Sequence, residues 1–159
     1  MDWRPTSRLT LASATTYMRS WYSGLDGVLR KGAFDMPLVA NFSGNALVGK
    51  GWTVSFRYST STGRPFTPDN MVLSTAQDRD VYDLTKLNSL RAPIYRRLDF
   101  RGEWAHPTQH GTLSVHLGLE NALGTTNFYS NLWMPWHDEG VEQQNQMPRF
   151  PDFGIKFSR

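Results

Sequence analysis

Cysteine is absent from the 159-residue sequence, and histidine is scarce. Without cysteine the chain has neither a disulfide framework nor a thiolate metal site, although this absence identifies no cellular compartment. The spacing of the four histidines matches no metal-ligand motif. These residues are His106, His110, His116 and His137. We therefore expect no metal and no cofactor.

Long hydrophobic runs are missing too. No window approaches the roughly 18 apolar residues of a membrane-spanning helix. The N-terminal segment MDWRPTSRLTL lacks the basic and apolar regions of a signal peptide. We expect either a cytoplasmic protein or a chain without its original N-terminal part. A mean hydropathy of −0.49 does not exclude the membrane, because membrane β-strands are short alternating segments with a weak signal.

The chain also lacks a basic cluster and the usual catalytic motifs. Its formal charge is only +3 and its Lys and Arg residues are scattered, which does not suit a nucleic-acid surface. There is no G-x-S-x-G elbow. The Gly63–Pro65 segment has neither the glycine spacing nor the following helix of a phosphate loop. We therefore expect neither a nucleic-acid partner nor an enzyme.

Alternation of apolar and polar residues is the main positive signal. In YRRLDFRGEW, residues 95–104, Leu98, Phe100 and Trp104 share one parity. Charged residues hold the other parity, which predicts a strand with one apolar and one charged face. Similar patterns predict six strands in all. They lie near residues 8–22, 38–47, 52–60, 95–104, 112–121 and 152–159.

The connections between these strands alternate in length. Short turns are expected at 48–51 and 106–111, and long loops at 23–37, 63–93 and 123–148. All three long loops then lie at one end of the sheet, which is typical of outer-membrane β-barrels and uncommon in compact soluble domains. Aromatic residues near the strand ends suit the interfacial girdles of such a barrel. They are Trp21, Tyr22, Trp52, Tyr95, Trp104, Phe128 and Tyr129.

Four segments occur in an order that carries a resemblance. They are GWTVSFRYSTSTGRPFTPDN, LNSLRAPIYRRLDFR, LENALGTTNFY and RFPDFGIKFSR. Together they resemble the C-terminal barrel strands of TonB-dependent outer-membrane receptors, especially the large transporters of Bacteroidetes or Acidobacteria. The resemblance covers about residues 38–159. One departure is the final Arg159, since family barrels usually end on an aromatic residue.

The resemblance implies an all-β, antiparallel transmembrane barrel fragment, with about six strands of a larger, 22-stranded barrel. Residues 1–159 would be the C-terminal part of the barrel, with the plug domain and signal peptide absent. The implied function is active uptake of a large nutrient, such as an iron chelate or an oligosaccharide, across the bacterial outer membrane. The implied partners are outer-membrane lipid, the rest of the receptor, TonB–ExbB–ExbD through the absent N-terminal part, and an unidentified transported ligand.

The segment NLWMPWHDEG, residues 131–140, supplies the candidate ligand-binding residues. The aromatic faces of Trp133 and Trp136 suit a sugar ring or a siderophore, with Asp138 and Glu139 beside them. The alternative is that both tryptophans pack the loop or lie in the interfacial belt. Two other functions stay open at this point: a soluble all-β carbohydrate-binding module, and a small outer-membrane enzyme.

Overall fold

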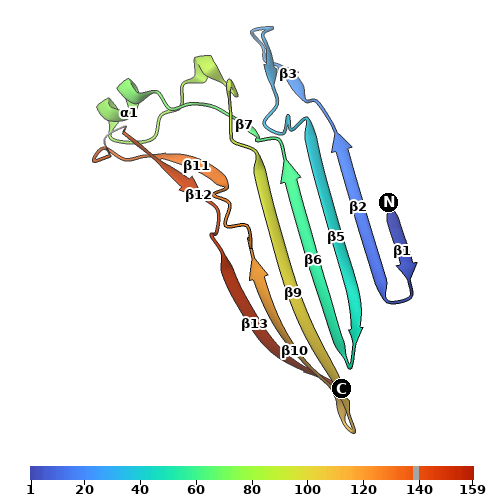
Figure 1. The fold of residues 1–159 in the computed structure, drawn as a ribbon. Coiled ribbons are helices and arrows are strands. Elements are labelled where there is room, and N and C mark those ends of the chain that lie inside the picture. The colour runs from blue at the N-terminus through green and yellow to red at the C-terminus, as the bar shows by residue number, and fades with distance from the viewer. Residues whose placement is uncertain (138–139) are drawn as a thin grey trace.

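The structure is a computed structural model that describes residues 1–137 and 140–159. It is all-β and antiparallel, with one seven-stranded sheet in the order β1-β2-β5-β6-β9-β10-β13. The bounds are β1 Asp2–Thr6, β2 Leu9–Tyr17, β5 Leu38–Gly49, β6 Trp52–Ser61, β9 Tyr95–Thr108, β10 Gly111–Glu120 and β13 Phe150–Ser158. The sheet is open, and β1 and β13 form its two edges (Figure 1).

The six predicted strands are all present, but the predicted number is one too low. The extra strand is β1, whose sequence DWRPT is short, contains Pro5 and pairs with β2 through an irregular register. A short strand of this kind shows no alternation over 4–8 residues, so pattern analysis misses it. The first predicted strand is also too long, because β2 ends at Tyr17 and the later residues form a separate short strand.

Tight turns join the strands at one end of the sheet. Lys50 and Gly51 connect β5 to β6 with φ angles of 53° and 83°, and positive φ at both central residues is what a type I′ hairpin turn requires. The turn between β9 and β10 is shorter than predicted, because β9 extends to Thr108. His106 therefore lies in a strand, where its ring stacks on Trp104 at 5.3 Å between centroids.

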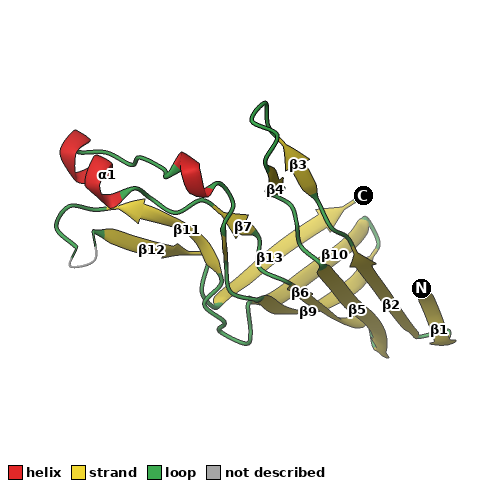
Figure 2. Cartoon of the chain, turned by 90° about the horizontal axis from the view of Figure 1, so that it is seen from above, coloured by secondary structure: helices red, strands yellow, loops and turns green. Residues whose placement is uncertain are grey.

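The three long connections all lie at the opposite end, as predicted, but they contain secondary structure (Figures 1 and 2). The first holds the hairpin of β3, Trp21–Ser23, and β4, Leu29–Lys31. The second holds β7 Pro65–Phe66, α1 Met71–Gln77, the 3-10 helix η1 Leu84–Lys86 and β8 Leu90–Arg91. The third holds the hairpin of β11, Phe128–Trp133, and β12, Val141–Asn145. These elements are too short for periodicity to reveal them.

The strand register confirms the two-faced pattern. Directly opposed residues form one row across all seven strands: Trp3, Leu11, Gly44, Phe56, Phe100, Leu119 and Pro151. Residues of the other parity are mostly polar, including Asp99 of β9 and Lys156 of β13.

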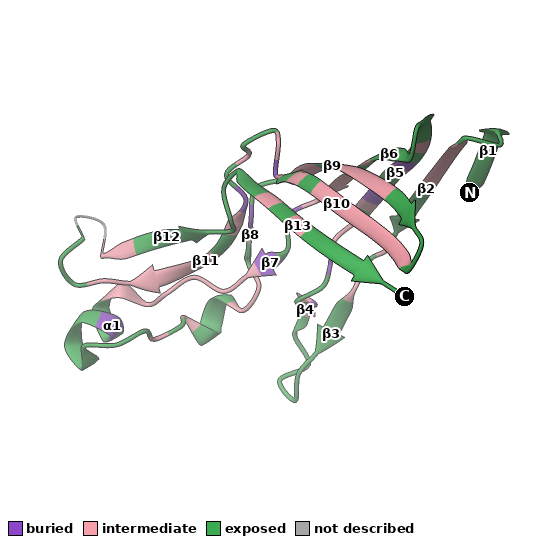
Figure 3. Cartoon of the chain, turned by 90° about the horizontal axis from the view of Figure 1, so that it is seen from below, coloured by how far each residue is buried: buried purple, intermediate pink, exposed green. Residues whose placement is uncertain are grey.

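The apolar face of the sheet is not covered by a second layer. Phe153, Ile155 and Leu117 of this face are 81%, 73% and 65% exposed. Within residues 1–137 and 140–159, Ala40 and Ala92 are the only buried hydrophobic residues. Figure 3 shows the strands of the main sheet as mainly intermediate or exposed. The sheet therefore has no hydrophobic core of its own, unlike a soluble sandwich, which packs two sheets face to face.

Among the described residues, no helix is long and apolar enough to cross a membrane.

Candidate functional site: the polar face and the loop end of the sheet

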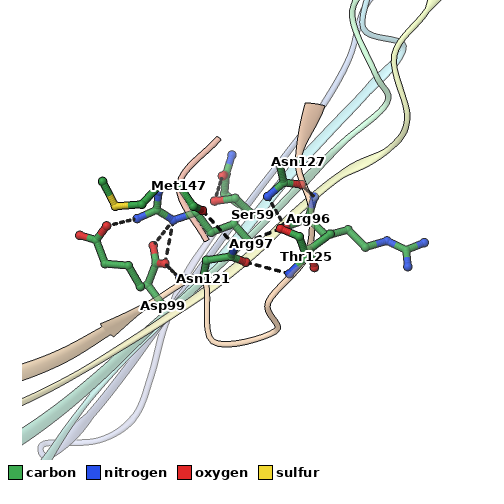
Figure 4. A network of polar contacts seen from close by, with 10 residues as sticks. Ser59, Arg96, Arg97, Asp99, Asn121, Thr125, Asn127 and Met147 are labelled. Atoms are coloured by element: carbon green, nitrogen blue, oxygen red, sulfur yellow. Dashed lines mark hydrogen bonds and ion pairs between the residues drawn. The ribbon is translucent and has the colours of Figure 1, made fainter. Parts of the chain in front are cut away.

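The charged row predicted from the sequence forms ion pairs on the polar face. Arg97 lies between two carboxylates: its Nε is 2.7 Å from Asp99 Oδ1 and its Nη2 is 2.9 Å from Glu120 Oε2 (Figure 4). Arg101 pairs with Glu103 at 3.3 Å. Positive and negative side chains therefore pair with one another along β9 and β10.

The neighbouring strands carry neutral hydrogen bonds on the same face. Ser55 donates to Asn45 at 2.7 Å, and Ser59 donates to Asn41 at 2.9 Å, each across the β5–β6 pair. A hollow of about 300 Å³ lies over this part of the sheet, and its lining includes Asn45, Ser55, Arg57, Arg101 and Glu120. Each of these two hydrogen bonds joins a serine hydroxyl to the side-chain oxygen of an asparagine on the neighbouring strand.

His116 belongs to the polar face, as its parity predicts, and pairs with a carboxylate there. Its Nε2 is 3.2 Å from Asp152 Oδ2 on β13. Glycines make room for the imidazole ring and for the carboxylate: a Cβ on Gly154 would lie 2.4 Å from His116 Cε1, and one on Gly118 would lie 1.9 Å from Asp152 Oδ1. The pair therefore depends on two glycines that the sequence shows only as breaks in the polar row.

Two buried asparagines lie at the loop end of the main sheet. The first, Asn121, directly follows β10. Asn121 is 1% exposed and has a left-handed backbone, with φ at 49°. Its backbone N–H donates to Asp99 at 2.9 Å, and its side-chain amide donates to the carbonyls of Thr125 and Met147 at 3.0 and 3.2 Å (Figure 4). One residue thus joins the end of β10 to the turn after it and to the segment that precedes β13.

Asn127 replaces a strand partner at the start of β9. Its side-chain oxygen accepts the Arg96 N–H at 3.0 Å, and its amide nitrogen donates to the Arg96 carbonyl at 2.9 Å. The side chain therefore makes the two hydrogen bonds that a neighbouring backbone would make. Asn127 is only 3% exposed, and buried amides normally find such partners. This contact holds the third long connection against the main sheet.

A fully buried carboxylate connects the first long connection to the second. Asp35 is 0% exposed, and its Oδ1 accepts from Arg19 Nε at 3.1 Å and from the Ser20 N–H at 3.0 Å. Its Oδ2 accepts from Arg91 Nη2 at 2.6 Å. The backbone hydrogen bond from Ser20, together with those from Arg91 and Arg19, holds the pKa of Asp35 below its usual value although burial acts in the opposite direction.

Aromatic and charged contacts connect the second long connection to the third. Arg64 donates to the Tyr129 carbonyl, and its guanidinium lies 5.8 Å from the centre of the Tyr129 ring. The rings of Phe66 and Phe128 are 5.2 Å apart. These contacts border a hollow of about 190 Å³, whose lining includes Arg64, Phe128, Tyr129 and Tyr95. Aromatic walls with one guanidinium could receive a flat or anionic group.

Another hollow, of about 200 Å³, lies in the same long connections. It is lined by Phe66, Thr67, Asp69, Tyr82 and Asn131. Asp69 is the unusual member. Its Oδ1 is buried with no hydrogen-bond partner in the part of the chain that the structure describes. Burial, and to a smaller degree the charge of Asp80, raises the pKa of Asp69 above its usual value. Within that part of the chain, no group of three or more His, Cys, Asp or Glu residues could hold a metal ion.

The structure describes two of the four predicted ligand-binding residues, Trp133 and Trp136. Trp133 ends β11, and its backbone N–H donates to Asp80 at 2.6 Å, so this residue is tied to the second connection. Trp136 is 79% exposed. Asp138 and Glu139 lie outside the described residues, so their place in a site stays a prediction. Arg64, Tyr82, Asn131 and Tyr129 were not predicted as ligand-binding residues, because residues from separate loops meet only after folding.

No family model, curated protein or solved structure matches the chain.

Proposed function

We propose that this chain forms part of the β-barrel wall of a TonB-dependent outer-membrane receptor, in the C-terminal region of that barrel. The supporting observation is a sheet with one exposed apolar face and one polar face. On the apolar face Phe153 and Ile155 are 81% and 73% exposed, while charges on the opposite face pair with one another. A barrel wall requires this division between lipid and lumen.

The strand lengths suit a bilayer. Strands β6 and β10 have ten residues each, and β2 and β13 have nine. A transmembrane strand needs about 9–11 residues at a tilt of about 45°. Strands β5 and β9 are longer, with 12 and 14 residues, as expected for strands that extend beyond the hydrocarbon region.

Aromatic residues lie near both rims of the apolar face. Trp52, the first residue of β6, is directly opposite Trp104 of β9, next to the short turns. Tyr17 ends β2 at the loop side and is 74% exposed. Tryptophan and tyrosine at the two ends of a lipid-facing surface fit the membrane interfaces, where an apolar ring and a polar group can both be satisfied.

The two unpaired edge strands, β1 and β13, support the proposal that further strands pair with this sheet. Five strands lie between β1 and β13, and every neighbouring pair is antiparallel, so the two edge strands run in the same direction. If a barrel were closed by copies of this chain rotated about the barrel axis, β13 of one copy would lie parallel to β1 of the next. An antiparallel closure requires an odd number of additional strands, which gives the even total of bacterial barrels. We propose that the rest of the receptor supplies them.

The functional role that follows is transport without covalent catalysis. The chain would supply wall, lumenal charges and three extracellular connections. The hollows beside Tyr129 and Tyr82 would contribute to binding an iron chelate or an oligosaccharide. A plug domain in another part of the receptor would gate passage and receive energy through TonB, ExbB and ExbD. The location would be the bacterial outer membrane.

Spin labelling tests this proposal directly, because the chain has no cysteine and each introduced cysteine is unique. Phe153→Cys and Ile155→Cys report on the apolar face, and Ser114→Cys and Lys156→Cys are matched controls on the polar face of the same strand pair. In lipid bilayers we expect high oxygen and low nickel-chelate accessibility at 153 and 155, and the reverse at 114 and 156.

A soluble carbohydrate-binding module is the second candidate, and the 79% exposed Trp136 is the observation that favours it. In that case the chain would be a stable monomer in plain buffer, with Leu113, Val115 and Leu117 protected from solvent, and lipid would not change the label accessibilities. Such a result would exclude the barrel function.

A further inference from the structure

The hollow of about 200 Å³ in the long connections is rich in oxygen atoms and aromatic rings. Its lining consists of Phe66, Thr67, Asp69, Tyr82 and Asn131, and it is called the Asp69 hollow below. Four of the five side chains carry oxygen, and none of the five is cationic. The second connection supplies four of them and β11 supplies Asn131; Figure 2 shows β7 and α1 of the second connection beside the β11–β12 hairpin.

Backbone pairing brings the side chains of Asp69 and Tyr82 together. The two residues form an antiparallel bridge. Two backbone hydrogen bonds flank the bridge at 2.8 and 2.7 Å, from Asp83 to Pro68 and from Asn70 to Val81. Directly opposed residues of an antiparallel pair have their side chains on the same face, with Cβ atoms about 4.5–5.5 Å apart. The carboxylate and the phenol ring therefore line the hollow side by side.

The walls of the Asp69 hollow are held by contacts between the second and third connections. The Trp133 N–H donates to Asp80 Oδ1 at 2.6 Å. The ring of Phe66 lies 5.2 Å from the ring of Phe128. The two connections that form the hollow are thus joined at separate points, so the site is preorganised and a ligand need not order it on binding.

The carboxylate of Asp69 lacks a donor within the folded chain. Its Oδ1 is buried, and among the described residues no group donates a hydrogen bond to it. Buried polar atoms are normally hydrogen-bonded, and a buried carboxylate without a partner is costly. The raised pKa of Asp69 has the same origin, since burial is its main cause and the charge of Asp80 adds to it. Asp69 therefore offers an acceptor and a negative charge that the chain itself leaves uncompensated.

These properties discriminate between three kinds of ligand group. An anionic group would be repelled by Asp69 and Asp80 and would find no cation in the lining. A neutral hydroxyl would donate one hydrogen bond but leave the charge of Asp69 uncompensated. A protonated amine supplies both a positive charge and three donors. The Tyr82 ring, in a residue that is 55% exposed, offers the aromatic surface to which such a cation is attracted.

We infer that the Asp69 hollow binds a protonated amino group of the ligand, with Asp69 as acceptor and counter-ion and Tyr82 beside it. This inference rests on the proposed function, which places the hollow among the ligand-binding loops of a receptor. It goes further because it specifies a cationic group, which neither an oligosaccharide nor an iron chelate needs to carry. An amino sugar and an amine-bearing chelate are the two sources of this group.

Two matched pairs of probes test the inference and separate these sources. The first pair is a glucosamine tetramer and its N-acetylated form. The second is an iron–hydroxamate chelate with one free primary amine and its acetylated form. Calorimetry with the full chain in detergent micelles, at pH 6 so that the amines are protonated, measures each Kd. In at least one pair we expect the amine to bind about tenfold or more tightly than the acetylated probe, as a charge-assisted hydrogen bond would give.

Two aspartate variants locate the source of this preference. Asp69→Asn keeps the size of the side chain and removes its charge, so the amine should bind no more tightly than its acetylated partner. Asp83→Asn removes the same charge from the next position but one along the same loop segment, where the carboxylate accepts from Thr85 and pairs with Lys86 outside the lining. The preference for the amine should persist in Asp83→Asn.

Equal affinities within both pairs, or no binding of any of the four probes, would overturn the inference. A preference that survives Asp69→Asn, or that is lost equally in Asp83→Asn, would also overturn it, because general attraction to negative charge would then explain the binding. The comparison within a pair needs no variant, so it stays decisive if Asp69→Asn does not fold. The proposed function fails by a different measurement, namely high nickel-chelate accessibility at positions 153 and 155 in lipid, where no ligand is involved.

Discussion

The carboxylate of Asp35 accepts a hydrogen bond of 2.6 Å from the guanidinium of Arg91, which lies 56 residues further along the chain. The same arginine donates to the backbone carbonyls of Asp35 and Gly63 at 2.6 and 2.7 Å. One side chain thus joins the first long connection to both ends of the second. Removal of a partner from a buried charge leaves that charge uncompensated, which is a strongly destabilising change.

Arg91→Met should therefore release the first long connection. Chymotrypsin cleavage next to Tyr22 and Phe34, followed by mass spectrometry, measures this release, and we expect it to become severalfold faster. Arg79→Met is the matched control, because the guanidinium of Arg79 donates to the exposed side chain of Gln77 within its own loop. Equal cleavage rates in both variants would show that Asp35 does not hold the loops together.

The buried Asn121 should be needed for stability through its side chain and its backbone separately. Asn121→Gly keeps the left-handed backbone but leaves two carbonyls without a donor, with an expected cost of about 1–3 kcal/mol. Asn121→Ala adds the strain of a positive φ, about 1 kcal/mol more. Urea unfolding in detergent micelles measures both. If alanine is no worse than glycine, the backbone conformation contributes nothing.

Two aspartates of one loop should give opposite dependences of stability on pH. Burial raises the pKa of Asp69, so its ionisation penalises the folded state above that pKa, and the penalty is relieved as pH falls toward the unfolded value of 3.8. Asp69→Asn should therefore increase stability at neutral pH, with a smaller gain near pH 4.

Asp83 is the matched contrast. Hydrogen bonds from the Thr85 side chain, and then from Lys86, lower the pKa of Asp83. Its stabilisation is present above the unfolded pKa of 3.8 and is lost as pH falls through the lowered folded value. Asp83→Asn should destabilise the protein at neutral pH, and the difference should shrink below pH 4. Thermal unfolding between pH 3 and 8 measures both variants, and parallel curves would contradict the assigned environments.

The β5–β6 turn should depend on Gly51. A Cβ there would lie 2.2 Å from the Ala105 carbonyl oxygen, and φ is 83°. Gly51→Ala should cost about 1–3 kcal/mol of unfolding free energy. Gly27→Ala is the control: φ is 70° there, but nothing lies within 4 Å, so only the conformational cost of about 1 kcal/mol remains. Equal losses in urea unfolding would exclude the steric contribution of Ala105.

Much of the main sheet was predictable because a strand turns successive side chains to opposite faces. The alternation Leu98–Phe100 against Arg97–Asp99 is enough to assign these residues to two faces, and the register confirms it. The lengths of the connections are equally local and correctly placed three long loops at one end. Strand β1 escaped prediction because five residues with a proline show no period.

The loop site was not predictable in the same way. Tyr82 and Asn131 line one hollow although 49 positions separate them in the sequence, and Arg64 and Tyr129 meet across 65 positions. No local pattern marks such pairs, since each residue is ordinary in its own segment. The sequence instead pointed to Trp133 and Trp136 because tryptophans are conspicuous, and the structure ties Trp133 by its backbone and leaves Trp136 exposed.

The sequence by itself determined which residues share a face, because side-chain alternation is a local property of an extended backbone. Only the tertiary structure decided that the apolar face is uncovered and that Asp35 and Arg91 connect two loops. Those features depend on the register between strands and on contacts between distant segments. Both arise when the chain pairs with itself, so no single stretch of sequence contains them.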